Sequence, residues 1–276
     1  MPNSRALTMA REAVAMLSMI RAQLFRIAKS RFIIFFALIV VLFAFATPFA
    51  LWLHNVWPAF AATGFVEIPD EPLPALQLYG VSFVAGSFLA MGVSVATVYY
   101  VAEDFKSGFL KNLVQARGGR VSYVIAMTLC SIVIAAAAAI MGMLVVEVAL
   151  RAQGYVSVPP SVSDALQWFS QLVLCMVAYA IVAVFLTVTT GSETVATIGA
   201  ILIAGGAVES VLKVILANVP GIPVVLRDCL DGYLATDLAM LSQGIICDPL
   251  TYAQAIITIL VAIAACVLVM RRRSLD

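Results

Sequence analysis

The sequence predicts an all-α integral membrane protein with six transmembrane helices. Hydrophobic residues make up 63% of the 276 residues and charged residues 11%, whereas soluble domains average about 45–50% and about 25%. A soluble globule of this composition could not cover its surface with polar groups. The apolar residues also fall in blocks, several of which reach the ~20 residues that a helix needs to cross a bilayer. Helices are favoured over barrel strands because the blocks do not alternate apolar and polar residues.

Six apolar stretches mark the predicted spans of a single transmembrane domain, 1–276. They cover about 33–53, 79–102, 121–149, 166–190, 194–217 and 250–270.

Lys and Arg predict the orientation, because they collect on the cytoplasmic side of membrane proteins. All but three of the 16 basic residues precede the first span, lie between spans two and three, or follow the last span. The three exceptions are Arg151, Lys213 and Arg227. Both termini and the loop 103–120 are therefore expected in the cytoplasm. The connections expected outside are 54–78, 150–165 and 218–249.

Residues 7–30, before the first span, repeat apolar side chains at helical spacing, with basic and polar residues between them. This pattern predicts an amphipathic helix that lies in the cytoplasmic interface. The alternative is a signal peptide, since Ala-Phe-Ala at 44–46 resembles a cleavage site. A charged region of 31 residues before the apolar stretch and five further spans argue against cleavage.

The last exterior connection, 218–249, has too many Leu and Ile for a solvated loop and too many Asp for a span. We expect a short helix, or helices, that dip into the outer leaflet and pack against protein. Cys229 and Cys247 both lie here, and an oxidising exterior would allow a disulfide if the segment folds back near Gly232 or Thr236. On one continuous helix, a rise of 1.5 Å per residue would hold them ~27 Å apart and forbid it. Both alternatives stay open.

Glu209 and Lys213 are charges within the fifth predicted span. They are four residues apart in the favourable order, which predicts an internal ion pair. The alternative is that Glu209, one turn after Gly205 and Gly206, lines a polar translocation path. His54 is the single histidine, and no His and Cys spacing is typical of a metal site.

The sequence lacks the residues that catalysis would need. It has no GxxxxGK[ST] phosphate loop and no Ser-His-Asp or Cys-His set. We therefore expect that the chain is not itself an enzyme and binds no cofactor. Uphill transport would draw energy from an ion gradient or from a partner that hydrolyses nucleotide. Ion-coupled carriers usually have buried carboxylates or repeated halves, and neither is evident here.

The loop from Glu103 to Arg120, EDFKSGFLKNLVQARGGR, is predicted to form a short amphipathic helix. Glu103 and Asp104 suit a first turn, where acidic residues favour the helix dipole. Gly118 and Gly119 suit a helix C-terminus. The apolar residues near one face are Phe105, Phe109, Leu110 and Leu113.

The stretch AEDFKSGFLKNLVQARGGRVSYVIAM resembles the first cytoplasmic loop of ABC-2-type permeases, where an acidic-aromatic pair, a Gly, a Lys and an Arg before span three form the coupling helix. The matching positions are Glu103, Phe105, Gly108, Lys111 and Arg120. SGFLKN is similar to the version in permeases of the lantibiotic-immunity and bacitracin-resistance type. The chain departs from the pattern where the family often has Thr, Pro and Lys. These departures are Phe109, Gly118-Gly119 and Met127.

The resemblance implies a permease subunit of a bacterial ABC exporter in the plasma membrane. It would pair with a second permease, a copy of itself or a sister subunit, and with ATP-binding subunits that hold ATP and Mg²⁺. Phe105, Phe109, Leu110 and Leu113 would enter the partner's groove, Lys106, Lys111 and Arg117 would contact its rim, and Arg120 would anchor span three. The substrate would be an amphiphile such as a peptide antibiotic, a drug or a lipid-like molecule. A gradient-driven carrier and a non-transporting scaffold or sensor remain alternatives, and no nucleic-acid partner is expected.

Overall fold

The computed structural model describes residues 3–57, 74–108, 119–218 and 232–272, and nearly all of these residues are helical. The elements in order are α1 (Asn3–Lys29), α2 (Arg31–Val56), α4 (Ala75–Tyr79), the π-helical η1 (Gly80–Val84), the 3₁₀ turn η2 (Ala85–Ser87), α5 (Phe88–Lys106), α7 (Gly119–Ala152), α8 (Val162–Thr190), α9 (Glu193–Ala204), α10 (Ala207–Asn218), α12 (Leu234–Ser242) and α13 (Leu250–Arg272). The described residues contain no strand, apart from an isolated bridge between Pro74 and Val158. The all-α prediction is confirmed.

The long helices identify a multi-pass membrane protein. Five helical segments among the described residues are long and apolar enough to cross a bilayer, and α9 with α10 makes a sixth if this bent pair counts as one span. Serine side chains accept backbone N–H bonds at the starts of α2, α8 and α9 and so satisfy donors that a helix start leaves free. These caps are Ser30, Ser161 and Ser192.

Helix α8 forms the centre of the bundle and packs against α5, α7, α9 and α13. In its most apolar window 72% of the residues are buried, against 22% for α2 and for α13. Trp168, Leu172, Met176 and Ile181 are fully buried along α8. The outer helices expose large apolar side chains instead, as expected of surfaces that face lipid.

The second predicted span is interrupted where α4, η1 and η2 precede α5. Gly86 and Ser87 both have positive φ, of 66° and 57°, which breaks the helix there. Gly80 lies against the end of α12 so closely that a Cβ would lie 2.5 Å from the carbonyl oxygen of Ser242. A residue with a side chain could not occupy this position without moving α12.

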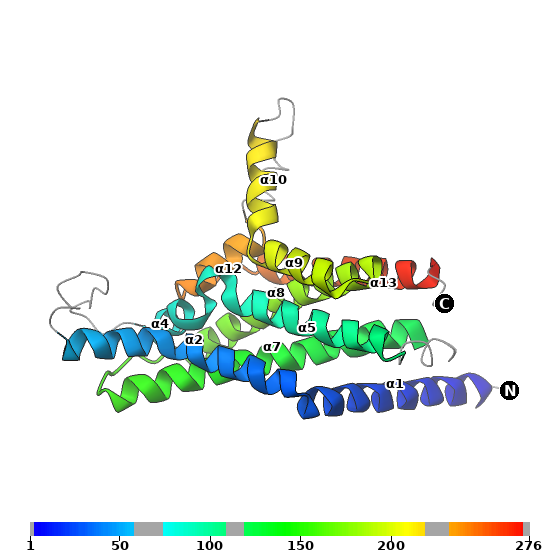
Figure 1. Cartoon of the computed structure of the whole chain (residues 1–276), viewed down its shortest axis with the longest axis horizontal. Helices are drawn as coiled ribbons and strands as arrows, with labels where there is room; N and C mark the ends of the chain where they lie inside the picture. Colours follow the sequence, from blue (N-terminus) through cyan, green and yellow to red (C-terminus); the bar gives the residue numbers. More distant parts are fainter. Residues whose placement is uncertain (1–2, 58–73, 109–118, 219–231, 273–276) are drawn as a thin grey trace.

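The fifth predicted span is wrong as one continuous helix. Helices α9 and α10 meet at a bend of 60° at Gly205 and Gly206. Gly206 has φ +77°, which an L side chain rarely adopts. Figure 1 shows α10 projecting sideways from the other helices, so 194–217 does not run along the bundle as a whole.

The helix predicted over 7–30 is present as α1, and its place in the cytoplasmic interface stays a prediction. Figure 1 shows α1 running lengthwise, in roughly the direction of α2. The face of α1 that carries Gln23 and Arg26 binds a buried carboxylate of α5.

The expectation of a short packed helix in 218–249 is confirmed for α12. Leu234, Leu238 and Leu241 are buried, and two side chains of α8 satisfy the backbone beside them. Trp168 Nε1 donates to the Leu241 carbonyl at 3.0 Å, and Gln171 exchanges two hydrogen bonds with the backbone of Cys247. The polar backbone of this non-spanning segment is therefore paired within the protein, as burial requires.

Candidate functional site

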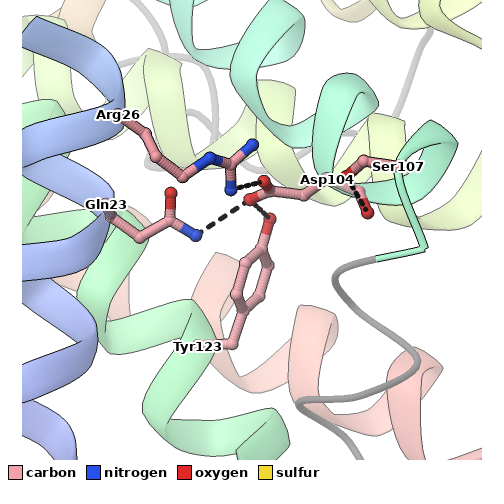
Figure 2. Close-up of polar contacts among 5 residues, drawn as sticks. All are labelled: Gln23, Arg26, Asp104, Ser107 and Tyr123. Atoms are coloured by element: carbon pink, nitrogen blue, oxygen red, sulfur yellow. Dashed lines mark hydrogen bonds and ion pairs between the residues drawn. The ribbon is translucent and has the colours of Figure 1, made fainter. Parts of the chain in front are cut away.

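Asp104 is the most deeply buried charged residue among those described, with 0% of its surface exposed. It lies in the last turn of α5, where a negative charge opposes the helix dipole. Three side chains from two other helices compensate it. Tyr123 Oη and Gln23 Nε2 each donate to Asp104 Oδ2 at 2.9 Å, and the Arg26 guanidinium pairs with Oδ1 (Figure 2). We call these four residues the Asp104 network.

The network corrects the predicted start of a helix at Glu103. Helix α5 ends at Lys106, and Gly108 just beyond it has a φ of +69°, the left-handed geometry common after a helix. Glu103 and Asp104 therefore close a helix instead of opening one. Gly119, expected at a helix C-terminus, is buried in the first turn of α7.

The Asp104 network joins three elements at the point where the chain leaves α5 and re-enters α7. Gln23 and Arg26 belong to α1, Asp104 to α5 and Tyr123 to α7 (Figure 2). Because the carboxylate accepts from three donors, one of which is the Arg26 guanidinium, the buried charge is neutralised and hydrogen-bonded. The end of α5 and the start of α7 are thereby attached to each other and to α1.

A second contact at this end joins α5 to α9. Lys106 Nζ lies 2.5 Å from Glu193 Oε2, and the two side chains are 62% and 32% exposed. Glu193 is in the first turn of α9, where a carboxylate suits the helix dipole. Lys106 was expected to contact a partner's rim, and here it binds within the chain.

The structure describes only some of the other predicted coupling residues. Glu103 is half-buried in the last turn of α5, and Arg120 is half-buried in the first turn of α7. Phe105 is partly buried and packs against the hydrophobic core, and its predicted contact with a partner stays a prediction. The remaining predicted residues, Phe109, Leu110, Lys111, Leu113 and Arg117, lie outside the described residues.

The predicted ion pair between Glu209 and Lys213 is confirmed, at 3.0 Å. Glu209 has a further role that the sequence did not reveal, because its Oε2 accepts from the backbone N–H of Ala235 at 3.1 Å. Lys213 Nζ donates to Thr236 Oγ1 at 2.8 Å. The pair therefore attaches α10 to the start of α12. A role for Glu209 in a translocation path stays a prediction.

Cys247 carries a free, buried thiol whose Sγ donates to the Asp237 carbonyl at 3.5 Å. Burial, with nearby Asp237, raises the pKa of this thiol to about 12, so the group is protonated at neutral pH. Its predicted partner, Cys229, lies outside the described residues, and the disulfide stays a prediction.

The Asp104 network was missed because the predicted span ended at Ala102. Continuing the helical spacing of α5 by one turn places Asp104 on the face of Val93, Thr97 and Val101, all of which are fully buried. An acidic residue on the buried face of a span requires a partner, and that requirement is the signal that could have identified it.

No protein-family model matches the chain, and a search of the curated proteins finds no match. Within the described ranges, no group of three or more His, Cys, Asp and Glu side chains is placed to hold a metal ion.

Proposed function

We propose that this chain is the permease subunit of a bacterial ABC exporter, located in the plasma membrane with both termini and the loop 103–120 in the cytoplasm. A separate subunit would bind ATP and Mg²⁺ and hydrolyse the nucleotide, and the chain would move an amphiphile such as a peptide antibiotic, a drug or a lipid-like molecule. The observation that carries the proposal is the Glu103 to Arg120 stretch, which begins in the anchored last turn of α5 and ends in the first turn of α7.

The anchors suggest how work done by a partner would reach the spans. The Asp104 network is buried, so the end of α5 and the start of α7 would move together with α1. The Lys106–Glu193 pair is exposed to water, where a single ion pair is weak and exchanges readily. A push on 109–118 would therefore displace α5 and α7 as one body, while the Lys106–Glu193 pair could break and re-form.

The partial burial of Phe105 bears on which residues of this loop would contact the partner. Because its ring packs on the core, the apolar contacts fall to Phe109, Leu110 and Leu113. Basic residues around them would steer docking to an acidic rim. These are Lys111, Arg117 and Arg120.

Substitution of Leu110 by Asp tests the proposal. The tagged chain is expressed in its native host, and the amount of any ATP-binding subunit that co-purifies with it is measured. A charge in an apolar contact that anchors the interface should reduce co-purification about tenfold or more. Ser163→Asp, which adds the same charge at the opposite end of the bundle, should leave co-purification unchanged. Equal recovery with Leu110→Asp and the parent chain would remove this loop as the docking element.

One observation favours a gradient-driven carrier as the second candidate. Asp237 is 6% exposed, and its Oδ2 has no hydrogen-bond partner among the described residues. Burial raises the pKa of this carboxyl, with a smaller contribution from Glu209. A carrier would move substrate in vesicles without any ATP-binding subunit, whereas the exporter would need ATP and stop with vanadate. A scaffold or sensor would move substrate in neither assay.

A further inference from the structure

A cavity of about 690 Å³ opens beside α4 and the end of α7, at the end of the bundle away from the start of α1 and the end of α13 (Figure 1). Its volume falls in the range of small-molecule sites, ~300–1,000 Å³. Tyr79 and Glu147 are polar residues that line it, and residues that follow α7 line it as well.

The carboxylate in this cavity already has partners on both oxygens. Tyr79 Oη donates to Glu147 Oε2 at 2.9 Å, and Arg151 Nε donates to Glu147 Oε1 at 2.6 Å. The acceptors of the cavity are therefore largely occupied. A cationic ligand would have to displace Arg151 to reach the carboxylate.

The cavity also has hydrogen-bond donors that Glu147 does not use. Arg151 uses one of its five guanidinium N–H groups on Glu147, and its side chain is 76% exposed. Tyr155 Oη accepts from Asn55 Nδ2 at 2.7 Å, which leaves its own O–H to donate. A fork of guanidinium N–H groups beside a phenol matches the oxygens of a phosphate group.

The apolar lining of the cavity and its position indicate the chemistry of the rest of the ligand. Leu150, Val156, Pro159 and Pro160 line it with apolar surface that a free phosphate ion would leave uncovered. Trp52 and Trp57, at the end of α2 that also provides Asn55, are about half exposed, as in the aromatic belt at a membrane surface. These tryptophans predict that the cavity lies at the level of lipid head groups.

We propose that this cavity binds a phosphate-bearing lipid, with the phosphate on Arg151 and Tyr155 and the start of the acyl chains on the apolar wall. Binding requires no ATP-binding subunit, so it can succeed or fail independently of the exporter proposal. The ion pair with Glu147 uses Arg151 Nε and leaves the terminal N–H groups of the guanidinium for the ligand.

The test measures equilibrium binding of dioctanoyl phosphatidylglycerol to the purified full chain in detergent. Arg151→Gln should weaken binding about 10- to 100-fold, the range expected for hydrogen bonds to a charged group. Arg151→Lys should recover part of the loss, because it restores the charge without the fork. Arg21→Gln, which removes a charge from α1, is the matched control and should bind like the parent chain.

A second variant separates ligand binding from structural damage. Glu147→Gln breaks the same ion pair but removes the competing anion, so it should bind the lipid as tightly as the parent chain or more tightly. If Arg151→Gln and Glu147→Gln weaken binding equally, the pair is structural and the proposal fails.

Two further probes distinguish the sources of affinity. Inorganic phosphate should bind at least tenfold more weakly than the lipid, and dioctanoylglycerol, which lacks the phosphate, should do the same. If inorganic phosphate binds as tightly as the lipid, the site is a simple anion site. If dioctanoylglycerol binds as tightly as the lipid, the site is an apolar cavity without phosphate recognition. Either result would overturn the proposal.

Discussion

Asp104 and Arg26 form an ion pair whose two members differ sharply in their access to water. Asp104 is fully buried, whereas the Arg26 side chain is 37% exposed. Loss of Arg26 would leave a buried carboxylate held by Tyr123 and Gln23, while loss of the carboxylate would leave a guanidinium that can reach water. An unpaired buried charge costs about 3–5 kcal/mol.

We expect Arg26→Met to lower the free energy of unfolding by ~3 kcal/mol or more, and Asp104→Asn to lower it by less. The double variant should regain part of the loss from Arg26→Met, because it removes the unpaired charge. Thermal unfolding in detergent measures all three variants. Equal effects of the two single substitutions would contradict the assigned burial.

Asp237 allows a prediction of pH dependence. Burial raises the pKa of its carboxyl above the ordinary value of 3.8, so the folded state binds this proton more tightly than the unfolded state does. The carboxyl therefore lowers the free energy of unfolding as pH rises above about 3.8, until it is ionised in both states. Asp237→Asn should stabilise the protein relative to the parent chain more at pH 7 than at pH 4. A difference that is independent of pH would show that Asp237 does not titrate with a raised pKa.

At the scale of elements, the breaks in spans two and five belong together. Helix α12 packs on η1 and η2 of span two, and Glu209 of α10 accepts from the start of α12. One short helix thus touches the irregular parts of both spans. The exchange of hydrogen bonds between Gln171 and Cys247 fixes the segment that follows α12 against α8.

Gly80 tests the contact between η1 and α12. Gly80→Ala places a Cβ 2.5 Å from the Ser242 carbonyl, and overpacking of this kind costs about 1–3 kcal/mol. Gly232→Ala is the control, since no atom of the described residues lies within 4 Å of its added Cβ. Thermal unfolding should show a lower midpoint for Gly80→Ala and little change for Gly232→Ala. An unchanged midpoint for Gly80→Ala would mean that α12 does not pack this closely.

At the scale of the molecule, the beginning of α1 and the end of α13 lie at the same end of the bundle (Figure 1). The concentration of Lys and Arg at this end, in the first helix, around the 103–120 loop and after α13, predicts that it is cytoplasmic. Ser107 and Ser163 are exposed at the two opposite ends.

Thiol labelling tests this orientation. In a chain with Cys229→Ala, a membrane-impermeant maleimide should label Ser107→Cys in inside-out vesicles and Ser163→Cys in intact cells. The cysteines 130, 175, 247 and 266 are buried and should stay largely unlabelled. Labelling of Ser107→Cys from outside would reverse the orientation.

The sequence by itself determined the helical membrane class, the approximate extent of five spans and the Glu209–Lys213 pair. These depend on local properties, since a long apolar block in lipid must satisfy its backbone within one helix. Residues four apart on a helix also meet whatever the rest of the chain does. The ends of the helices were predicted less accurately. The predicted end of span two, for example, lies four residues before the observed end of α5.

Tertiary structure decided the features that depend on contacts across the chain. Asp104 is buried because Gln23 and Arg26, about 80 positions earlier, reach it from α1. Span five bends where Gly206 permits a positive φ and where Glu209 meets the start of α12. The cavity at Arg151 is lined by Tyr79 of α4 and by Tyr155, which are far apart in the sequence. Hydropathy and periodicity predict which face of a helix is apolar and whether the helix can cross a membrane. They do not predict which polar side chain on another helix a residue will bind.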